Sequence, residues 1–162
     1  MSDLTPKQDN FILYTTPEGE VKLNVLLENE TIWLTQKSMS ILFDTTPQNI
    51  SIHLKNVFES AELEEEATCK EFLQVQIEGN RQVSRKQKFY NLDAIISVGY
   101  RVNSVRATQF RQWATQVLRE FAIKGYVLDK ERMENGSFLG EDYFERLLAE
   151  IREIRLSERR FY

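Results

Sequence analysis

Hydrophobic and polar residues alternate, as they do in β-strands, over two parts of this chain. In the first part, Phe11–Thr15 and Val21–Leu27 flank a turn at Pro17–Glu20 and predict a hairpin. Thr31–Trp33 predicts a short third strand after it. In the second part, residues 72–90 alternate on both sides of a break that contains glycine. We therefore expect a second hairpin there.

Between the two hairpins, the apolar residues change to the spacing of two short helices. The segment Leu34–Leu54 has the pattern of a helix-turn-helix. Thr35 can cap the first helix, and Thr46 followed by Pro47 can begin the second. Asp44 stands where the turn needs a residue that tolerates positive φ, usually glycine. The second helix is expected to bury one apolar stripe, formed by Ile50, Leu54, Val57 and Phe58.

The opposite face of the second helix is polar and predicts contact with duplex DNA. In helix-turn-helix proteins the start of this helix enters the major groove, where amides pair with adenine and apolar groups touch the thymine methyl. Lys55 and the helix starts are better placed for phosphates. The candidate contacts are Thr46, Gln48, Asn49, Ser51, Ile52, Lys55 and Asn56. The alternative interpretation is an ordinary amphipathic surface helix.

Basic residues follow the turn of the second hairpin and predict a wing. Arg81, Arg85 and Lys86 are the candidates for gripping the DNA backbone. A two-stranded ribbon after a helix-turn-helix is the arrangement of a winged helix. The alternative is a solvated hairpin whose charges only keep the protein in solution.

The second half of the chain is predicted to be helical. Asn91 can cap a helix over 93–98, and Ser104 can cap a longer one that Gly125 ends. The longer helix carries an aromatic-rich stripe expected to lie in the core, made of Phe110, Trp113, Ala114, Val117, Leu118 and Phe121. From Glu141 a last amphipathic helix repeats apolar residues at steps of three and four, at Phe144, Leu147, Ile151, Ile154 and Phe161.

These elements together predict an α+β fold and three segments. The fold is a winged helix-turn-helix-like domain with an N-terminal β-hairpin, a helical C-terminal half and a long terminal amphipathic helix. We expect disorder over 1–10, the domain with its helical extension over 11–125, and a linker and helix over 126–162. The last helix has no C-cap signal, which predicts that the chain is cut within it. Its stripe predicts a homodimer through 141–162, which would suit a palindromic DNA site.

The charge of the chain is divided unevenly, which changes what the total of −4 means. Residues 79–124 carry nine Lys or Arg against two acidic residues, a net +7, and residues 35–58 carry +1. Residues 1–34, 59–78 and 125–162 carry −4, −6 and −2. Phosphate attraction acts within a Debye length of about 8 Å, so the local values govern it. The acidic segments are expected to face away from DNA.

Composition excludes several other classes of function. The chain has one cysteine, Cys69, and one histidine, His53, so neither a disulfide framework nor a zinc set is expected. The six glycines never give the G-x-G-x-x-G of a dinucleotide site. We therefore expect no enzyme, no cofactor and no metal. No apolar run approaches the length of a membrane span, which predicts a cytoplasmic protein without membrane contact.

Four motifs of the chain resemble the virulence protein RhuM family of bacteria. They are Thr31–Gln36 (TIWLTQ), His53–Phe58 (HLKNVF), Tyr90–Ser104 (YNLDAIISVGYRVNS) and Ala107–Ala114 (ATQFRQWA). The resemblance extends over nearly the whole chain from residue 11. It implies a longer protein associated with virulence, and it supplies no catalytic residue.

Two functions from different classes are compatible with these patterns. The first is a DNA-binding protein, either a transcriptional regulator or a factor of a virulence or mobile-element system, that reads duplex DNA with helix 46–58 and a basic wing. The alternative is a protein-interaction or assembly module of a virulence system that uses a winged-helix scaffold without DNA. Salt separates them, because phosphate contacts release counterions and weaken steeply as salt rises.

Overall fold

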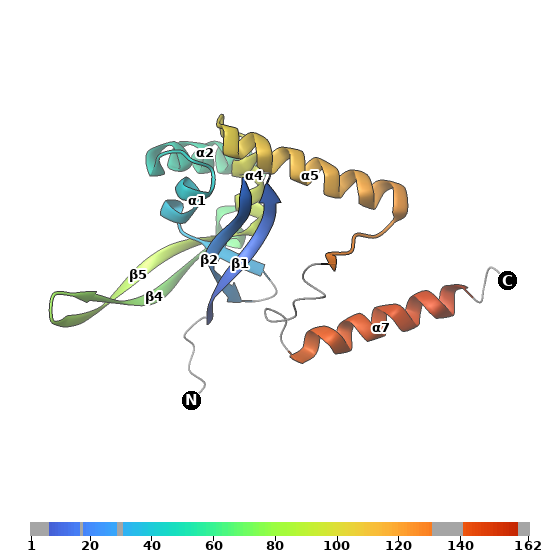
Figure 1. The fold of residues 1–162 in the computed structure, drawn as a ribbon. Coiled ribbons are helices and arrows are strands. Elements are labelled where there is room, and N and C mark those ends of the chain that lie inside the picture. Colours follow the sequence, from blue (N-terminus) through green and yellow to red (C-terminus); the bar gives the residue numbers. More distant parts are fainter. Residues whose placement is uncertain (1–6, 17, 29–30, 131–140, 159–162) are drawn as a thin grey trace. The chain divides into compact units, whose positions relative to one another are not determined.

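Two hairpins form one five-stranded antiparallel sheet in the computed structural model of the chain. The first hairpin is β1 (Lys7–Thr16) and β2 (Gly19–Glu28), and the second is β4 (Cys69–Glu78) and β5 (Arg81–Asn91). Strand β3 (Thr31–Leu34) lies between them, in the order β1-β2-β3-β5-β4. Strands β1 and β4 are therefore the two edges of the sheet (Figure 1).

The structure describes residues 7–16, 18–28, 31–130 and 141–158. The chain divides into two compact units, Met1–Tyr126 and Val127–Tyr162. All five strands belong to the first unit, together with every described helix that precedes residue 126.

Strand β3 is short but joins the two hairpins. Leu26 and Leu27 of β2 pair with Trp33 and Ile32, while Trp33 and Leu34 pair with β5. The second hairpin extends beyond this junction as a two-stranded ribbon that stands away from the rest of the first unit (Figure 1). The sheet is thus packed on helices near β3 and unsupported toward the turn of the ribbon.

The described helices of the first unit are α1 (Gln36–Leu42), α2 (Pro47–Glu59), α3 (Glu65–Thr68), α4 (Leu92–Gly99) and α5 (Val105–Lys124). All of them except α3 begin where a short polar side chain caps the first turn. As predicted, the side chains of Thr35, Thr46, Asn91 and Ser104 accept a backbone N–H three residues ahead. Gly125 ends α5 with φ of 80°, also as predicted. The α+β class is confirmed.

The main core lies between the helices and the sheet. Its largest fully buried side chains include Phe43, Phe110, Leu34, Met39 and Leu42. The predicted inner stripe of α2 is buried at Ile50, Leu54 and Val57, and Phe58 packs partly buried against it. A smaller apolar cluster is formed by Leu26, Trp33, Phe72 and Phe89. It fixes the start of the ribbon to β2 and β3.

The predicted core stripe of α5 is only half buried, which corrects the sequence analysis. Phe110 is 1% exposed, whereas Leu118 is 60% and Phe121 is 56% exposed. A helix of 20 residues is roughly 30 Å long, and only its first half meets the core. The second half continues past the sheet (Figure 1), and Leu118 and Phe121 of the stripe are largely exposed there.

The N-terminal boundary also differs from the expected one. Strand β1 begins at Lys7, so residues 7–10 are part of the sheet rather than of a disordered segment over 1–10. They pair with β2 between Lys7↔Leu27 and Asn10↔Asn24. The polar composition of the segment concealed a strand that is stabilised by its partner.

The second unit contains α7 (Glu141–Glu158), which begins where the sequence pattern places it. Ile151 and Ile154 of its apolar stripe are exposed, and Leu147 is half-buried. Phe161 and the side chain of Phe144, which the prediction also included, lie outside the described residues. Among the helices that the structure describes, none has the length and apolar character needed to cross a bilayer.

Candidate nucleic-acid interface

A tight turn joins α1 to α2, and Asp44 takes the left-handed conformation there. Its φ is 49°, which confirms the prediction that Asp44 takes the positive-φ position where a glycine is usual. The residue before it, Phe43, is fully buried and packs edge-on against Phe110 at 5.3 Å between ring centroids. Ser104 Oγ donates to the Phe43 carbonyl at 2.6 Å, and Arg106 Nη1 donates to the Ile41 carbonyl at 3.0 Å. The start of α5 thus holds the turn in place.

The first turn of α2 is built as a cap followed by proline. Thr46 Oγ1 accepts the Asn49 backbone N–H at 3.1 Å, and Pro47 occupies a first-turn position where no intrahelical bond is lost. The remaining backbone N–H groups of this turn point out of the helix start, which favours an anion such as a phosphate nearby. Thr46 itself is exposed.

Five of the predicted DNA contacts share the exposed face of α2. They are Gln48, Ser51, Ile52, Lys55 and Asn56. Burial of Ile50, Leu54 and Val57 on the opposite side fixes this orientation. Ile52 is 57% exposed, although it is a large apolar residue in the middle of a polar face. An exposed isoleucine between amide side chains matches a surface that meets both polar base edges and thymine methyl groups.

Asn49 is held differently from the other predicted contacts. Its side chain is only partly exposed, and its Nδ2 donates to Thr45 Oγ1 at 2.8 Å. This bond ties α2 to the turn. Gln48, which is exposed beside it, is therefore the freer amide at the start of the helix.

The three basic residues predicted for the wing divide between the two faces of the ribbon. Side chains alternate along a strand, so Arg81 and Arg85 lie on one face of β5 and Lys86 lies on the other. Cross-strand partners share a face, which places Lys86 beside Leu73 and Arg85 beside Gln74. All three basic side chains are exposed, but they do not form one cluster.

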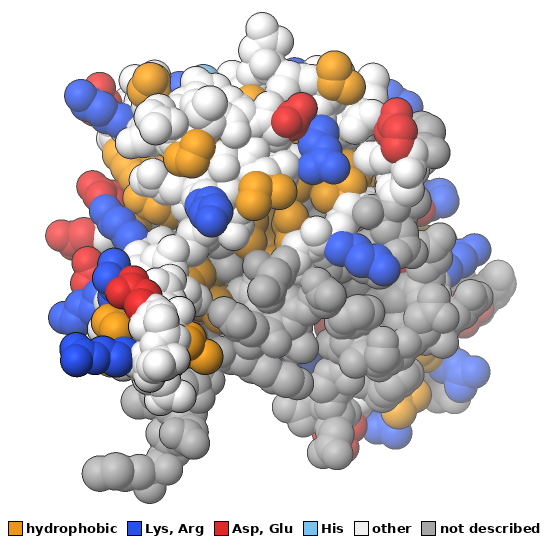
Figure 2. Space-filling model, turned by 60° about the vertical axis from the view of Figure 1, so that its left-hand side comes forward, with side chains coloured by type: hydrophobic (Ala, Val, Ile, Leu, Met, Phe, Trp, Pro, Cys, Tyr) orange, Lys and Arg blue, Asp and Glu red, His pale blue; other side chains and the backbone are white. Residues whose placement is uncertain are grey.

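Acidic neighbours reduce the positive charge of the ribbon that is available for contact with phosphate. Arg85 Nη2 lies 2.7 Å from Glu78 Oε1, and Lys88 Nζ lies 2.8 Å from Glu65 Oε1. The hydrogen bond to Glu65 raises the pKa of Lys88, so this lysine stays charged but paired. Within the described residues no ion pair involves Arg81 or Lys86. Figure 2 shows basic, acidic and hydrophobic side chains interspersed over this side of the molecule.

Three arginines that follow the ribbon in sequence have structural roles. Arg101 pairs with Glu62 at 2.8 Å, and Arg106 bonds the α1 carbonyl described above. Arg111 Nη1 donates to the carbonyls of Gly99 and Val102 at 3.0 and 2.8 Å. The +7 of residues 79–124 therefore overstates what is free to meet phosphate. Sequence charge alone gives no sign of these bonds.

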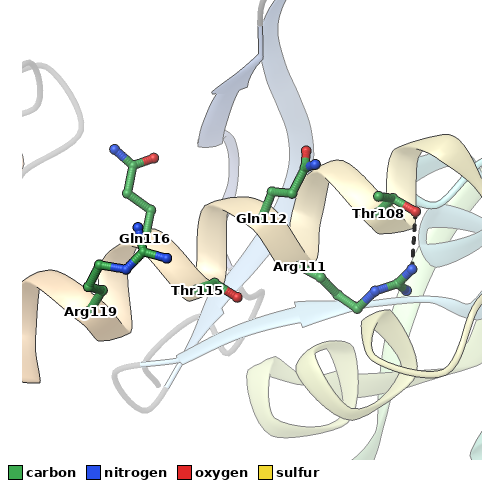
Figure 3. Close-up of a pocket in the computed structure, with 6 residues that line it drawn as sticks. All are labelled: Thr108, Arg111, Gln112, Thr115, Gln116 and Arg119. Atoms are coloured by element: carbon green, nitrogen blue, oxygen red, sulfur yellow. Dashed lines mark hydrogen bonds between the residues drawn. The ribbon is translucent and has the colours of Figure 1, made fainter.

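A shallow polar hollow runs along one face of α5 (Figure 3). It is lined by Thr108, Arg111, Gln112, Thr115, Gln116 and Arg119. The Arg111 guanidinium also bonds Thr108 Oγ1 at 3.1 Å, which leaves Arg119 as the free cation of this lining. All six residues come from one helix, so the hollow is a helix face and holds no convergent set of groups.

Lys37 is a candidate contact that the sequence analysis did not select. It is exposed in the first turn of α1, close in sequence to the Thr35 cap. The sequence contains a signal that could have identified Lys37. It is a basic residue at the start of the first helix of a predicted helix-turn-helix, and that helix crosses the DNA backbone.

Neither the histidine nor the cysteine lies in a reactive arrangement. Burial and the positive charge of Arg101 lower the pKa of His53, and burial raises the pKa of the Cys69 thiol. Across the described part of the chain, no group of three or more His, Cys, Asp or Glu is placed to hold a metal ion. The predicted contacts on α2 and the ribbon thus remain the candidate site.

Comparison with known proteins gives one match. A sequence model of the Virulence protein RhuM family matches residues 67–162, which include the ribbon, α4, α5 and α7. No curated protein and no solved structure matches the chain.

Proposed function

The chain belongs to the virulence protein RhuM family, and we propose that it acts there as a DNA-binding protein. In this proposal α2 enters the major groove and the ribbon contacts the backbone, in the manner of a winged helix. The observation that carries it is the exposed face of α2, where Gln48, Ser51 and Ile52 follow a capped and rigidly held turn. Regulation of transcription is the role that such reading would serve.

Phosphate contacts in this proposal come from exposed cations near the helix pair and on the ribbon. Lys37 is at the start of α1, Lys55 is on the exposed face of α2, and Arg81 and Lys86 are on β5. The Lys55–Glu59 pair, at 3.8 Å with both side chains well exposed, is weak enough for phosphate to replace it. Because free cations are few, we expect moderate affinity and a modest salt slope.

The experiment is selection of bound duplexes from random sequence with the full chain, followed by titrations at several salt concentrations. Gln48→Ala is expected to lose about 1–3 kcal/mol of discrimination at one base position. Lys86→Ala is expected to weaken binding to all DNA sequences alike. It should also lower the slope of log affinity against log salt concentration by about 1. Both effects follow from the separation of base reading from phosphate contact.

Matched controls test whether the effects belong to this surface. Asn103→Ala removes an exposed amide outside α2, and Lys124→Ala removes an exposed cation at the end of α5. Both are expected to bind like the unchanged chain. Affinity that does not fall with salt, or an equal loss in the controls, would contradict DNA reading by α2.

A protein-interaction module is the second candidate, and exposed apolar side chains favour it. Leu118 and Phe121 of α5 and Ile151 of α7 lie open to solvent. Apolar exposure of this kind marks surfaces that meet other proteins. In both candidates we propose that a homodimer forms through 141–162 in the cytoplasm, where two copies of α2 could read a twofold-repeated site.

A further inference from the structure

Over residues 72–77, the outer edge of β4 is a regular strand edge to which no other described strand pairs. Its register with β5 is continuous from Cys69↔Tyr90 to Glu78↔Arg81. Residues 72–77 contain neither proline nor a charged side chain. Natural sheets usually protect an edge with charges, proline, a bulge or a covering segment, because unpaired N–H and C=O groups recruit another strand.

The opposite edge of the same sheet provides an internal comparison. The register of β1 with β2 shifts between Ile12 and Tyr14, which is the irregularity that blunts an edge. Strand β4 has no such shift over its ten residues. One edge of the sheet is therefore protected and the other is available for pairing.

The exposed side chains of β4 are also of the apolar type found where one strand lies beside another. Leu73, Val75 and Ile77 share one face and are 63%, 60% and 76% exposed. Their β5 partners are Lys86, Ser84 and Gln82, which offer them little apolar contact. A row of β-branched and aliphatic residues gains most when another apolar row lies directly across from it.

We propose that β4 pairs antiparallel with β4 of a second copy, with Val75 opposite Val75 on the twofold axis. This inference goes beyond the proposed function and does not depend on DNA. In this register Leu73 faces Ile77 of the second copy and Gln74 faces its Gln76. Apolar residues thus meet apolar residues, and amides meet amides.

The charges at the ends of the paired strands are compatible with the same register. Phe72 comes opposite Glu78 of the second copy at each end of the paired segment, and Lys70 and Glu71 lie beyond it, level with the turn that follows Glu78. No two like charges are directly opposed. A one-residue shift would instead place two of the three apolar side chains opposite glutamines and the third opposite Phe72 or Glu78, so the proposed alignment is the one that pairs all three with apolar residues.

The pairing uses backbone groups at the edge, so both faces of the ribbon stay accessible. Arg81 and Lys86 lie on the inner strand β5 and project from the faces rather than from the edge. The second copy is therefore compatible with phosphate contact by the ribbon, and independent of any contact through α7.

Position-specific cross-linking of the full chain tests the proposal. Cys69→Ser removes the only cysteine and provides the background. In it, Val75→Cys is expected to form an intermolecular disulfide under mild oxidation, giving a reducible species of twice 19.1 kDa. Ser84→Cys is the matched control, since Ser84 is the exposed partner of Val75 on the inner strand and should remain monomeric on the gel.

The register is tested with two further variants. Leu73→Cys and Ile77→Cys should each cross-link poorly alone and several-fold better when the two chains are mixed. Equal cross-linking at 75 and 84, or no gain on mixing, would overturn the proposal. A Val75→Cys chain that stays monomeric would also overturn the proposal. It would indicate that the edge of β4 pairs instead with a strand of another protein. Loss of DNA binding with cross-linking intact would contradict the proposed function alone.

Discussion

The surroundings of His53 on α2 favour the neutral form of its ring. Partial burial and the nearby Arg101 lower its pKa below the ordinary value of 6.5. The unfolded chain therefore binds this proton more readily than the folded chain. The stabilising contribution of the neutral ring is complete above pH 6.5 and is lost as the pH falls below it, until the folded protein is also protonated.

A His53→Gln variant should reduce the acid sensitivity of the fold. We expect the thermal midpoint of the wild type to fall more than that of the variant between about pH 7 and pH 5. Since the chain has one histidine, the difference in slope isolates this side chain. Asn56→Ala, an exposed change in the same helix, should keep the wild-type slope. Equal slopes for wild type and His53→Gln would show that the proton is bound alike in both states.

Single residues were predicted well where a backbone requirement selects them. Thr35, Thr46 and Asp44 occupy the caps and the positive-φ turn expected from residue type, because each satisfies a local need. Side-chain partners were not predictable in this way. The bond from Asn49 to Thr45 and the pair of Arg85 with Glu78 depend on rotamers and on strand register. A polar residue type alone does not show whether its group is free.

At the scale of elements, the close approach of α4 to α5 depends on Gly99. A Cβ at this position would lie 2.5 Å from Phe110 Cε1 and 2.9 Å from Phe43 Cζ. Both rings are fully buried and pack edge-on against each other beside the turn between α1 and α2. The glycine is thus needed for space at the last turn of α4, where it costs some helix stability.

A Gly99→Ala substitution is expected to lower the free energy of unfolding by about 1–3 kcal/mol, because the overpacked rings must shift. Chemical denaturation measures this change. Ile96→Ala, at a residue of α4 that is 38% exposed, is the control and should cost less. If Gly99→Ala proved as stable as wild type, the two rings would have room that the packing does not indicate.

Elements were predicted more reliably than their burial. The α5 helix was located by its cap at Ser104 and its stop at Gly125, both local signals. Its stripe of apolar residues gave no indication of where the core ends, because periodicity records which face is apolar and not what covers it. The exposed Leu118 and Phe121 are the result.

At the scale of the whole molecule, the sheet combines two independent hairpins. The first hairpin and β3 precede the helix pair in sequence, and the second hairpin follows it. Both hairpins were predictable from alternation and turn residues. Their union in one sheet was not, since the pairing of β3 with β5 connects residues far apart in the chain. Long-range pairing of this kind leaves no periodic trace in the sequence.

The four-residue strand β3 has a kinetic consequence. Each hairpin closes over a short loop, whereas Leu34↔Tyr90 closes a loop of more than fifty residues. Long-range closure is the slow step in folding when local contacts form quickly. We expect β3 to dock on β5 in the transition state, after both hairpins have begun to form.

Refolding measurements on core variants would test this order. Leu34→Ala, at 1% exposure, should lower stability by roughly 2–5 kcal/mol, with much of the loss appearing as slower folding. Val25→Ala, equally buried in β2 but within a local hairpin, should act more through faster unfolding. The reverse partition would place the first hairpin in the nucleus. With the expected partition, docking of the shortest strand of the sheet sets the pace at which the surface of α2 is completed.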